Sequence, residues 1–333
     1  MSASWPRSAV TPSLGEIQAP VKDRLGQVAL ELRRIVVADF PMIEQISEHL
    51  LLMKGKLFRP TLTLLASSIE GRPAPRAATF GALVELVHLA TLVHDDSVDH
   101  SALRRGMPTV NSLFSHQISV IMGDFLYSRA VAELARLGDV EVLRTLASAT
   151  NEMTVGEMRQ LGAVDALQFS EDDYEALIRA KTASLLSAAC EIGCIAGAPD
   201  FRSVLSRYGR CLGMAFQVAD DLLDYTATEA SMGKPAGSDL REHKVTLPLI
   251  AVLPKMTQAE RREVETLFAS SNTDEDQISR VAGIVTEHGG LEYARNRGEQ
   301  FAEEAHAALA DLPESTASAA LHDAIAYAVD RSQ

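Results

Sequence analysis

Residues 83–99, LVELVHLATLVHDDSVD, place a cluster of aspartates directly after a long apolar run. Leu83, Leu86, Val87 and Ala90 recur at the three- and four-residue spacing of one helical face. The motif DDSVD, residues 95–99, ends the run, and its i, i+4 spacing puts the first and last carboxylates one helical turn apart. The stretch therefore predicts a buried helix that ends in a carboxylate cluster.

The same acidic pattern returns at residues 220–224, DDLLD, after a second apolar stretch, residues 211–219. One such motif is a weak signal, because the acidic face of a solvated helix can have the same residues at the same spacing. Two motifs behind apolar runs are not expected of a surface, since burying carboxylates without a cation is costly. Carboxylate oxygens suit Mg2+, which also accepts water and phosphate oxygens. The predicted metal ligands are Asp95, Asp96, Asp99, Asp220, Asp221 and Asp224.

Helical spacing also runs through most of the remaining chain. Hydrophobic residues make up 47% of the sequence but aromatic residues only 5%, and this aliphatic composition favours helix over sheet. No alternating strand pattern of useful length occurs, and the Gly- and Pro-containing breaks are too short for domain linkers. We therefore expect an all-α protein in which a flexible N-terminal tail, residues 1–15, precedes a single domain, residues 16–333.

Composition also excludes several classes of protein. The formal net charge of −14 argues against nucleic-acid binding, which needs a basic surface. Three cysteines are too few, and odd in number, for a disulfide framework. The apolar runs are too short or too interrupted for membrane insertion, and the N-terminus lacks the order of a signal peptide. We expect a cytoplasmic protein with no nucleic-acid partner and no stable membrane insertion.

Clustered basic residues stand out in so acidic a chain. Lys56 and Arg59 are three residues apart, and the pair Arg104-Arg105 follows the first aspartate motif. Further cations are Lys181, Lys244 and Lys234, the last in the Gly-rich stretch GKPAG, residues 233–237. Together with two Mg2+ motifs, these residues indicate a site for two diphosphates. One would be bound through metal and the other by Arg and Lys directly.

In this order, the motifs resemble those of the trans-polyprenyl diphosphate synthases, enzymes of the isoprenoid synthase fold. The resemblance covers roughly residues 25–330. It rests on both aspartate motifs, Lys56 and Arg59, Arg104-Arg105-Gly106, Lys181-Thr182, Phe216-Gln217 and residues 233–247. It implies a large helical bundle around a central cavity and a homodimer. It also implies head-to-tail condensation of isopentenyl diphosphate with an allylic prenyl diphosphate.

The resemblance also assigns roles to individual residues. The two aspartate motifs would hold three Mg2+ on the allylic diphosphate, which Arg104, Lys181, Lys234 and Lys244 would also contact. Isopentenyl diphosphate would be bound by Lys56, Arg59, His88 and Arg105. The catalytic residues would be Lys181, Thr182 and Gln217, of which Thr182 and Gln217 stabilise the allylic cation through their oxygens.

Two positions depart from the family pattern. Lys54 and His243 stand where the family usually has glycine, so a positive φ angle at either residue would be disfavoured. The second departure puts the placement of Lys244 in doubt.

Product length in related enzymes depends on the residues four or five positions before the first aspartate, where a bulky aromatic stops growth early. Here these positions hold Thr91 and Ala90, with Val87 one turn deeper. None is large, so we expect a long-chain product. Residues 125–127, Phe-Leu-Tyr, are either a deeper floor of the tunnel or ordinary core.

Three alternatives remain. The first is a short-chain geranylgeranyl or farnesyl diphosphate synthase. A class I terpene cyclase usually has a different second metal motif and lines its pocket with aromatics. A non-catalytic subunit of a heteromeric synthase tends to lose the acidic motifs, and both are intact here.

Overall fold

The structure is a computed structural model, which describes residues 11–53, 55–71, 73–161, 166–226, 237–270 and 274–330. Lys54 and Lys234 lie outside the described residues. The first half of the chain forms α1 (Leu14–Gln18), η1 (Ala19–Val21), α2 (Lys22–Ile35), α3 (Pro41–Leu52), α4 (Phe58–Ala66), α5 (Ala77–Val98), β1 (Leu103–Arg104), β2 (Met107–Pro108), α6 (Val110–Leu113), α7 (His116–Leu137) and α8 (Val140–Leu161). The second half forms η2 (Ala166–Gln168), α9 (Glu171–Ile178), η3 (Arg179–Ala183), α10 (Ser184–Gly197), η4 (Pro199–Phe201), α11 (Arg202–Thr226), α13 (Ser238–Arg241), α14 (Leu247–Ile250), η5 (Leu253–Lys255), α15 (Gln258–Ala269), α16 (Glu275–Glu287), α17 (Gly290–Ala308) and α18 (Thr316–Val329).

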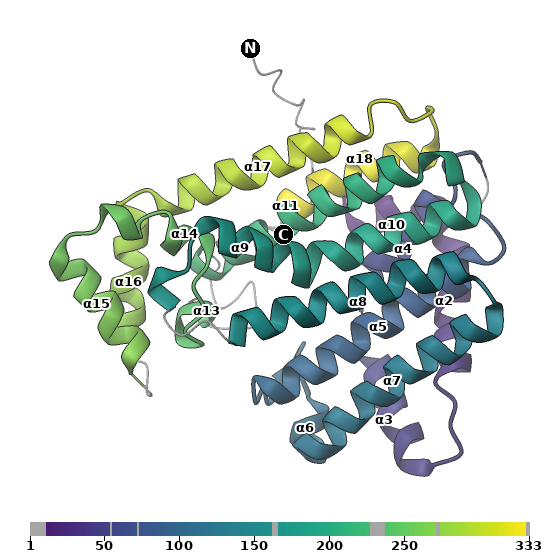
Figure 1. Ribbon diagram of the computed structural model, residues 1–333, viewed down its shortest axis with the longest axis horizontal. Helices are drawn as coiled ribbons and strands as arrows, with labels where there is room; N and C mark the ends of the chain where they lie inside the picture. The colour runs from purple at the N-terminus through teal and green to yellow at the C-terminus, as the bar shows by residue number, and fades with distance from the viewer. Residues whose placement is uncertain are drawn as a thin grey trace.

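The long helices lie beside one another in a bundle (Figure 1). Helix α5 packs against α2, α4, α7 and α10, and α10 in turn packs against α4, α8 and α11. By length and composition α5 could cross a membrane, but 67% of its most apolar stretch is buried inside the protein. It is therefore a core helix, and the predicted all-α class is confirmed.

Close packing of α4 on α10 brings the start of α4 to the centre of the bundle. A Cβ atom on Gly193 would lie 2.3 Å from the carbonyl oxygen of Thr63, and one on Gly197 would lie 2.2 Å from that of Ser67. Real side chains cannot occupy such positions, so only glycine allows this approach. The approach fixes where Phe58 and Arg59, at the beginning of α4, lie.

A short hairpin interrupts the helices after α5. Strands β1 and β2 pair antiparallel, with Arg104 opposite Met107. Arg105 and Gly106 have φ angles of 51° and 75°, as in a two-residue type I′ turn, whose twist suits a hairpin. The sequence predicts only a loop here, because two residues a strand are too few to show an alternating pattern.

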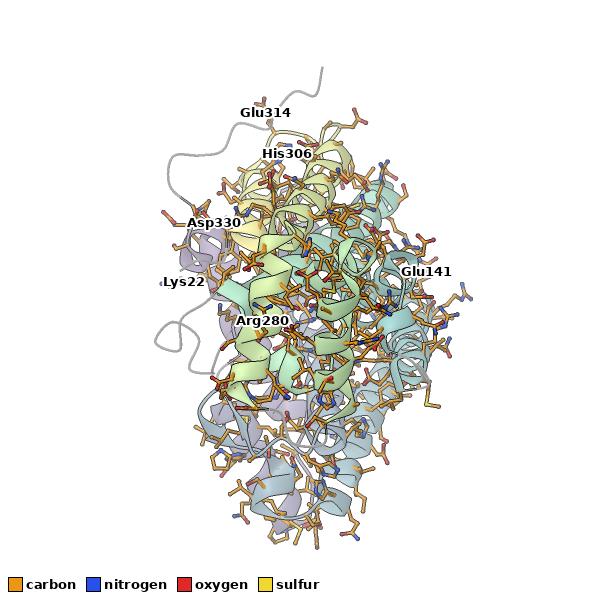
Figure 2. All side chains as sticks on the ribbon, turned by 90° about the vertical axis from the view of Figure 1, so that its left-hand side faces the viewer. Lys22, Glu141, Arg280, His306, Glu314 and Asp330 are labelled. Carbon is orange, nitrogen blue, oxygen red and sulfur yellow. The ribbon has the colours of Figure 1, made fainter. Side chains whose placement is uncertain are left out.

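A second, smaller apolar cluster holds the end of the molecule formed by α15 and α16. Leu240, Leu249 and Val264 are buried in it, together with Val281 and Val285 of α16. Figure 2 faces this end, with Arg280 labelled on α16. The cluster anchors the segment between α13 and α14, which carries His243 and Lys244 to the centre.

Candidate active site

Two adjoining cavities open where the helices converge. The first, of about 380 Å³, is lined by the start of α4, by α5 between Glu85 and Asp95, and by parts of the hairpin, α8, η3, α10, α11 and α18. The second, of about 390 Å³, is lined by residues of α8, α9 and the segment between α13 and α14. Lys181, Thr182 and Gln217 line both cavities. The two cavities are therefore neighbouring parts of one site.

Most predicted site residues meet at these cavities. Those lining the first are Lys56, Arg59, His88, Thr91, Asp95, Arg104, Arg105, Lys181, Thr182, Gln217 and Asp220. Those lining the second include Asp99, Asp221 and Lys244. Residues as distant in sequence as Lys56 and Asp220 thus line one cavity, as the two-diphosphate hypothesis requires.

One end of the first cavity is cationic. Arg59 Nη1 lies 3.0 Å from His88 Nε2. Burial, and the charges of Arg59 and Arg105, hold the pKa of His88 well below its ordinary value, so the ring is neutral and accepts from Arg59. The Nε atom of Arg59 is buried, and no described residue accepts its hydrogen. A buried guanidinium donor without a partner favours binding of an anion.

Glu85 places a carboxyl group beside the arginines of this cationic end. The sequence motifs did not point to this residue. It is buried at 5% exposure, and burial raises its pKa while Arg59 and Arg105 lower it. A Cβ atom on Gly55 would lie 3.1 Å from Glu85 Oε1 and 3.3 Å from Arg105 Nη1. In the sequence, Glu85 could have been noticed as the one acidic residue inside the apolar run of residues 83–93.

The first aspartate motif divides its carboxylates between different partners. Both carboxylate oxygens of Asp96 share the single N–H of Arg104 Nε, at 2.8 and 2.9 Å, so Arg104 is anchored by the protein itself. Asp95 lines the first cavity, and burial raises its pKa to about 6. Asp99 lines the second cavity, where its carboxylate lies 3.8 Å from Lys244 Nζ.

The three carboxylates of the second motif also have different partners. Asp220 lines the first cavity. Asp221 accepts hydrogen bonds from the Tyr174 hydroxyl at 2.6 Å and from Gln217 at 2.8 Å, and burial raises its pKa to about 8. Asp224 accepts from the backbone N–H groups of Ser238 and Asp239, at 3.1 and 2.9 Å, and so holds the start of α13.

The acidic groups suit divalent cations whose coordination is completed by a ligand. Within the described residues, no group of three His, Cys, Asp or Glu side chains is placed to hold a metal ion by itself. Hard carboxylate oxygens nonetheless line both cavities, and burial raises the pKa of Asp95 to about 6 and that of Asp239 to about 7. Such carboxylates gain from a nearby cation. Mg2+ commonly takes its remaining ligands from water and phosphate.

Lys181 and Thr182 lie in a π-helical turn, η3, between α9 and α10. Such turns are frequent at functional sites. Lys181 Nζ pairs with Glu157 of α8 at 2.7 Å and lies 3.4 Å from Gln160 Oε1. Thr182 donates to Gln217 at 2.7 Å. The turn thus directs Lys181 toward α8 and Thr182 toward α11.

Strained backbone surrounds the site. His243 has a φ angle of 56°, so the residue that replaces the family's glycine adopts the disfavoured left-handed conformation. His is among the residues that tolerate it best. Lys244 still lines the second cavity and pairs with Glu242 at 2.6 Å. Leu57 and Arg105, with φ angles of 49° and 51°, line the first cavity.

An aromatic wall closes the first cavity on the side of α18. Phe58 stacks on Phe216, with ring centroids 5.9 Å apart, and packs at 5.7 Å against Tyr327. Nothing in the sequence pointed to Tyr327, since it lies in the terminal helix, 271 positions from the Lys56 side chain that it contacts.

Only one of the three candidate chain-length residues lines the first cavity. Thr91 lines the first cavity, together with Leu92, Met153, Leu185 and Leu186. Val87 and Ala90 are buried in the core, at 1% and 3% exposure, and are not among the described residues that line it.

Comparison with known proteins agrees with this architecture. Residues 40–285 match the polyprenyl synthetase family. The chain belongs to this family. It is 38% identical, over 96% of its length and 98% of the relative's, to an all-trans-nonaprenyl-diphosphate synthase (geranyl-diphosphate specific) of Rhodobacter capsulatus. The family resemblance that the motifs predict is thereby confirmed.

Solved structures of the polyprenyl synthetase family share the fold. One is a polyprenyl synthase from Caulobacter crescentus complexed with calcium and isoprenyl diphosphate, with a TM-score of 0.91, 33% identity, and coverage of 98% of this chain and 99% of that one. Another is a decaprenyl diphosphate synthase from Rhodobacter capsulatus, with a TM-score of 0.90, 35% identity, and coverage of 96% and 100%.

Proposed function

We propose that the protein is a trans-prenyltransferase that condenses isopentenyl diphosphate with an allylic prenyl diphosphate to give long-chain all-trans polyprenyl diphosphate. The observation that carries the proposal is the juxtaposition, in one cavity, of an anion-binding end and an acidic end. The first holds Arg59, whose buried Nε–H has no acceptor among the described residues, and the second holds Asp95 and Asp220. Two diphosphate-bearing substrates need both ends at once.

The proposed roles follow the positions of the residues. Lys56, Arg59, His88 and Arg105 bind isopentenyl diphosphate at the cationic end. Lys181, Lys244 and Arg104 lie toward the acidic end and stabilise charge on the departing allylic diphosphate. Lys234, outside the described residues, is assigned to the same group by its motif. Thr182 and Gln217, hydrogen-bonded to each other, direct oxygens toward the allylic cation.

The reaction needs no protein nucleophile. The allylic C–O bond breaks, the alkene of isopentenyl diphosphate forms the new C–C bond, and a proton leaves to the released diphosphate. Asp95, Asp99 and Asp220 are the carboxylates best placed to hold Mg2+, with Asp96, Asp221 and Asp224 supporting them. Mg2+, three ions on the family pattern, would supply neutralisation of the diphosphate charge. Calcium in the Caulobacter crescentus relative supports a divalent cation.

The proposed activity is tested with purified protein, Mg2+, labelled isopentenyl diphosphate and farnesyl diphosphate. We expect labelled products longer than the primer, resolved by chromatography, and none without primer or after removal of Mg2+. Absence of extension in the complete mixture would contradict the proposal. Exclusively cyclic hydrocarbon products would favour a terpene cyclase.

Product length is proposed to depend on the wall beneath Asp95. Thr91→Phe places a ring directly in the cavity and should shorten the main product, while the wild-type protein makes a long chain, as the named relatives do. Ala90→Phe, which adds bulk behind the wall, should shorten it too, with a greater loss of stability. Unchanged product length in both variants would contradict the assignment of Val87, Ala90 and Thr91.

We further propose a cytoplasmic homodimer that packs through α7 and α8. Ile121 of α7 and Met158 of α8 are large apolar side chains exposed at 65% and 66% in the single chain. Covering them with a second copy would remove this apolar surface from water.

A further inference from the structure

Both ends of the chain reach the short loop that carries Lys56. From α1, Gln18 Nε2 donates to the Lys56 carbonyl at 2.9 Å and to Thr61 Oγ1 at 3.1 Å. From α18, the Tyr327 hydroxyl accepts a hydrogen bond from Lys56 Nζ at 3.0 Å. The Lys56 ammonium also lies 5.6 Å from the centre of the Tyr327 ring. One helix thus holds the backbone of Lys56 and the other holds its side chain.

The two terminal helices support each other. Helix α1 packs against α18, and Thr11 donates a hydrogen bond to Asp330 just beyond the end of α18. Figure 2 shows Asp330 on the same side of the molecule as Lys22, which begins α2 directly after η1. The termini therefore form one unit beside the first cavity, rather than two separate ends.

Lys56 needs this support more than its neighbours do. Arg59 and Arg105 are held by His88 and by the Met53 carbonyl oxygen, at 3.0 and 3.2 Å. Lys56 is exposed, has a long flexible side chain, and precedes Leu57, whose φ angle is 49°. An ammonium has three donors, so one bond to Tyr327 leaves two for a phosphate while fixing the position of the charge.

We propose that Tyr327 and Gln18 are positioning residues for the isopentenyl diphosphate subsite and act on it through Lys56. The proposal rests on the proposed function, which assigns this end of the cavity to isopentenyl diphosphate. Preorganised donors bind a ligand without the cost of ordering them at that moment. Loss of either contact therefore weakens binding of isopentenyl diphosphate and leaves the allylic end of the cavity unaffected.

The test compares Tyr327→Phe with wild type in steady-state kinetics, varying each substrate while the other is saturating. The variant keeps the ring against Phe58 and removes only the oxygen. We expect the KM for isopentenyl diphosphate to rise about tenfold, as for a hydrogen bond to a charged group, with kcat and the allylic KM within about twofold. Gln18→Leu should raise the same KM about threefold.

The matched control is Tyr293→Phe. Tyr293 also loses a hydrogen bond from its hydroxyl, to Glu171 at 2.7 Å, but it does not line the first cavity. Its kinetics should equal those of wild type. Melting temperatures of all variants should agree within a few degrees, which separates a local effect from unfolding.

A double-mutant cycle shows whether Tyr327 acts through Lys56. Lys56→Met raises the KM for isopentenyl diphosphate, and adding Tyr327→Phe to it should have no further effect. Additive effects, an equal rise in the allylic KM, or a wild-type KM for Tyr327→Phe would overturn the inference. If wild type itself does not elongate, the proposed function fails; if it elongates and Tyr327→Phe is unchanged, only this inference fails.

Discussion

At the residue scale, aspartates of the same motif have different environments and different roles. Asp95 and Asp220 begin the two motifs and line the first cavity, whereas Asp96 is engaged by Arg104 and Asp224 by the backbone at the start of α13. Adjacent positions on a helix point about 100° apart, so two neighbouring aspartates cannot share one environment. Each motif thus combines an acid that lines the first cavity with an acid held by the protein itself. The held acid is the next residue, Asp96, in the first motif and the residue one turn later, Asp224, in the second.

This division predicts different losses for two neighbouring substitutions. Asp95→Asn should reduce kcat roughly a hundredfold and raise the Mg2+ concentration needed for half-maximal rate, with little change in melting temperature. Asp96→Asn breaks the pair with Arg104 and should cost about 1–3 kcal/mol of unfolding free energy. Kinetics across a Mg2+ titration, with thermal unfolding of both variants, checks this. Identical profiles for the two variants would contradict the assignment.

At the scale of elements, the site depends on how closely helices approach. Helix α4 brings Arg59 to the cavity only because α10 offers Gly193 and Gly197 at their contact. The π-helical turn η3 likewise sets Lys181 toward α8 and Thr182 toward α11. The two glycines have no side chain to offer a substrate, whereas the turn carries two proposed site residues, Lys181 and Thr182. Both features decide where the proposed substrate-binding groups lie.

The helix contact can be tested by one methyl group. Gly193→Ala would bring Cβ to 2.3 Å from the Thr63 carbonyl oxygen, so α4 must move, and we expect a loss of about 2–4 kcal/mol together with a higher KM for isopentenyl diphosphate. Gly283→Ala, in α16 with open space around it, should instead add about 0.5–1 kcal/mol. Denaturant unfolding measures both, and equal effects of the two substitutions would refute the argument.

An ion-pair cluster links α2 to α7 and gives a pH dependence. Glu133 is 8% exposed and accepts hydrogen bonds from Arg136 of α7 and Arg34 of α2, which lower its pKa to about 2. As pH falls, the unfolded chain takes up this proton near the ordinary value of 4.5, before the folded chain does. The stabilisation is therefore complete above pH 4.5 and is lost as pH falls toward about 2.

Glu133→Gln should lower stability at neutral pH by about 1–2 kcal/mol, a modest value because both arginines are substantially exposed. It should also make the unfolding free energy fall less steeply as the pH is lowered from 4.5 toward 2. Glu44→Gln, an exposed acid on α3, should do neither. Unfolding free energies between pH 2 and 7 decide the matter, and a wild-type slope in Glu133→Gln would contradict the linkage.

At the scale of the whole molecule, the bundle joins positions that the chain keeps far apart. Helices α1 and α18 meet beside the cavity, and Lys56 contacts Tyr327 across nearly the whole sequence. The long helix α5 has the composition of a membrane span because α2, α4, α7 and α10 pack around it and bury most of its apolar side chains.

The exposed apolar side chains of α7 and α8 predict an assembly. Ile121→Glu should place a charge in the interface of the proposed homodimer, and because desolvating an unpaired charge is costly, it should shift the protein toward monomer. Light scattering after size-exclusion chromatography measures this mass. Val140→Glu changes a comparably exposed residue at the start of α8 and tests whether the proposed interface extends to that end of the helix. A dimer that persists in Ile121→Glu would move the interface elsewhere.

Helical periodicity and fixed motif spacing are local properties, so the sequence alone was enough to predict the all-α class, the family and most of the residues that line the two cavities. It could not separate Asp95 from Asp96, find Glu85 or Tyr327, or place Val87 and Ala90 behind Thr91. It predicted a loop where the hairpin aims Arg104 at Asp96. These features depend on which helices approach, and on contacts between residues distant in the chain, so only the tertiary structure decides them.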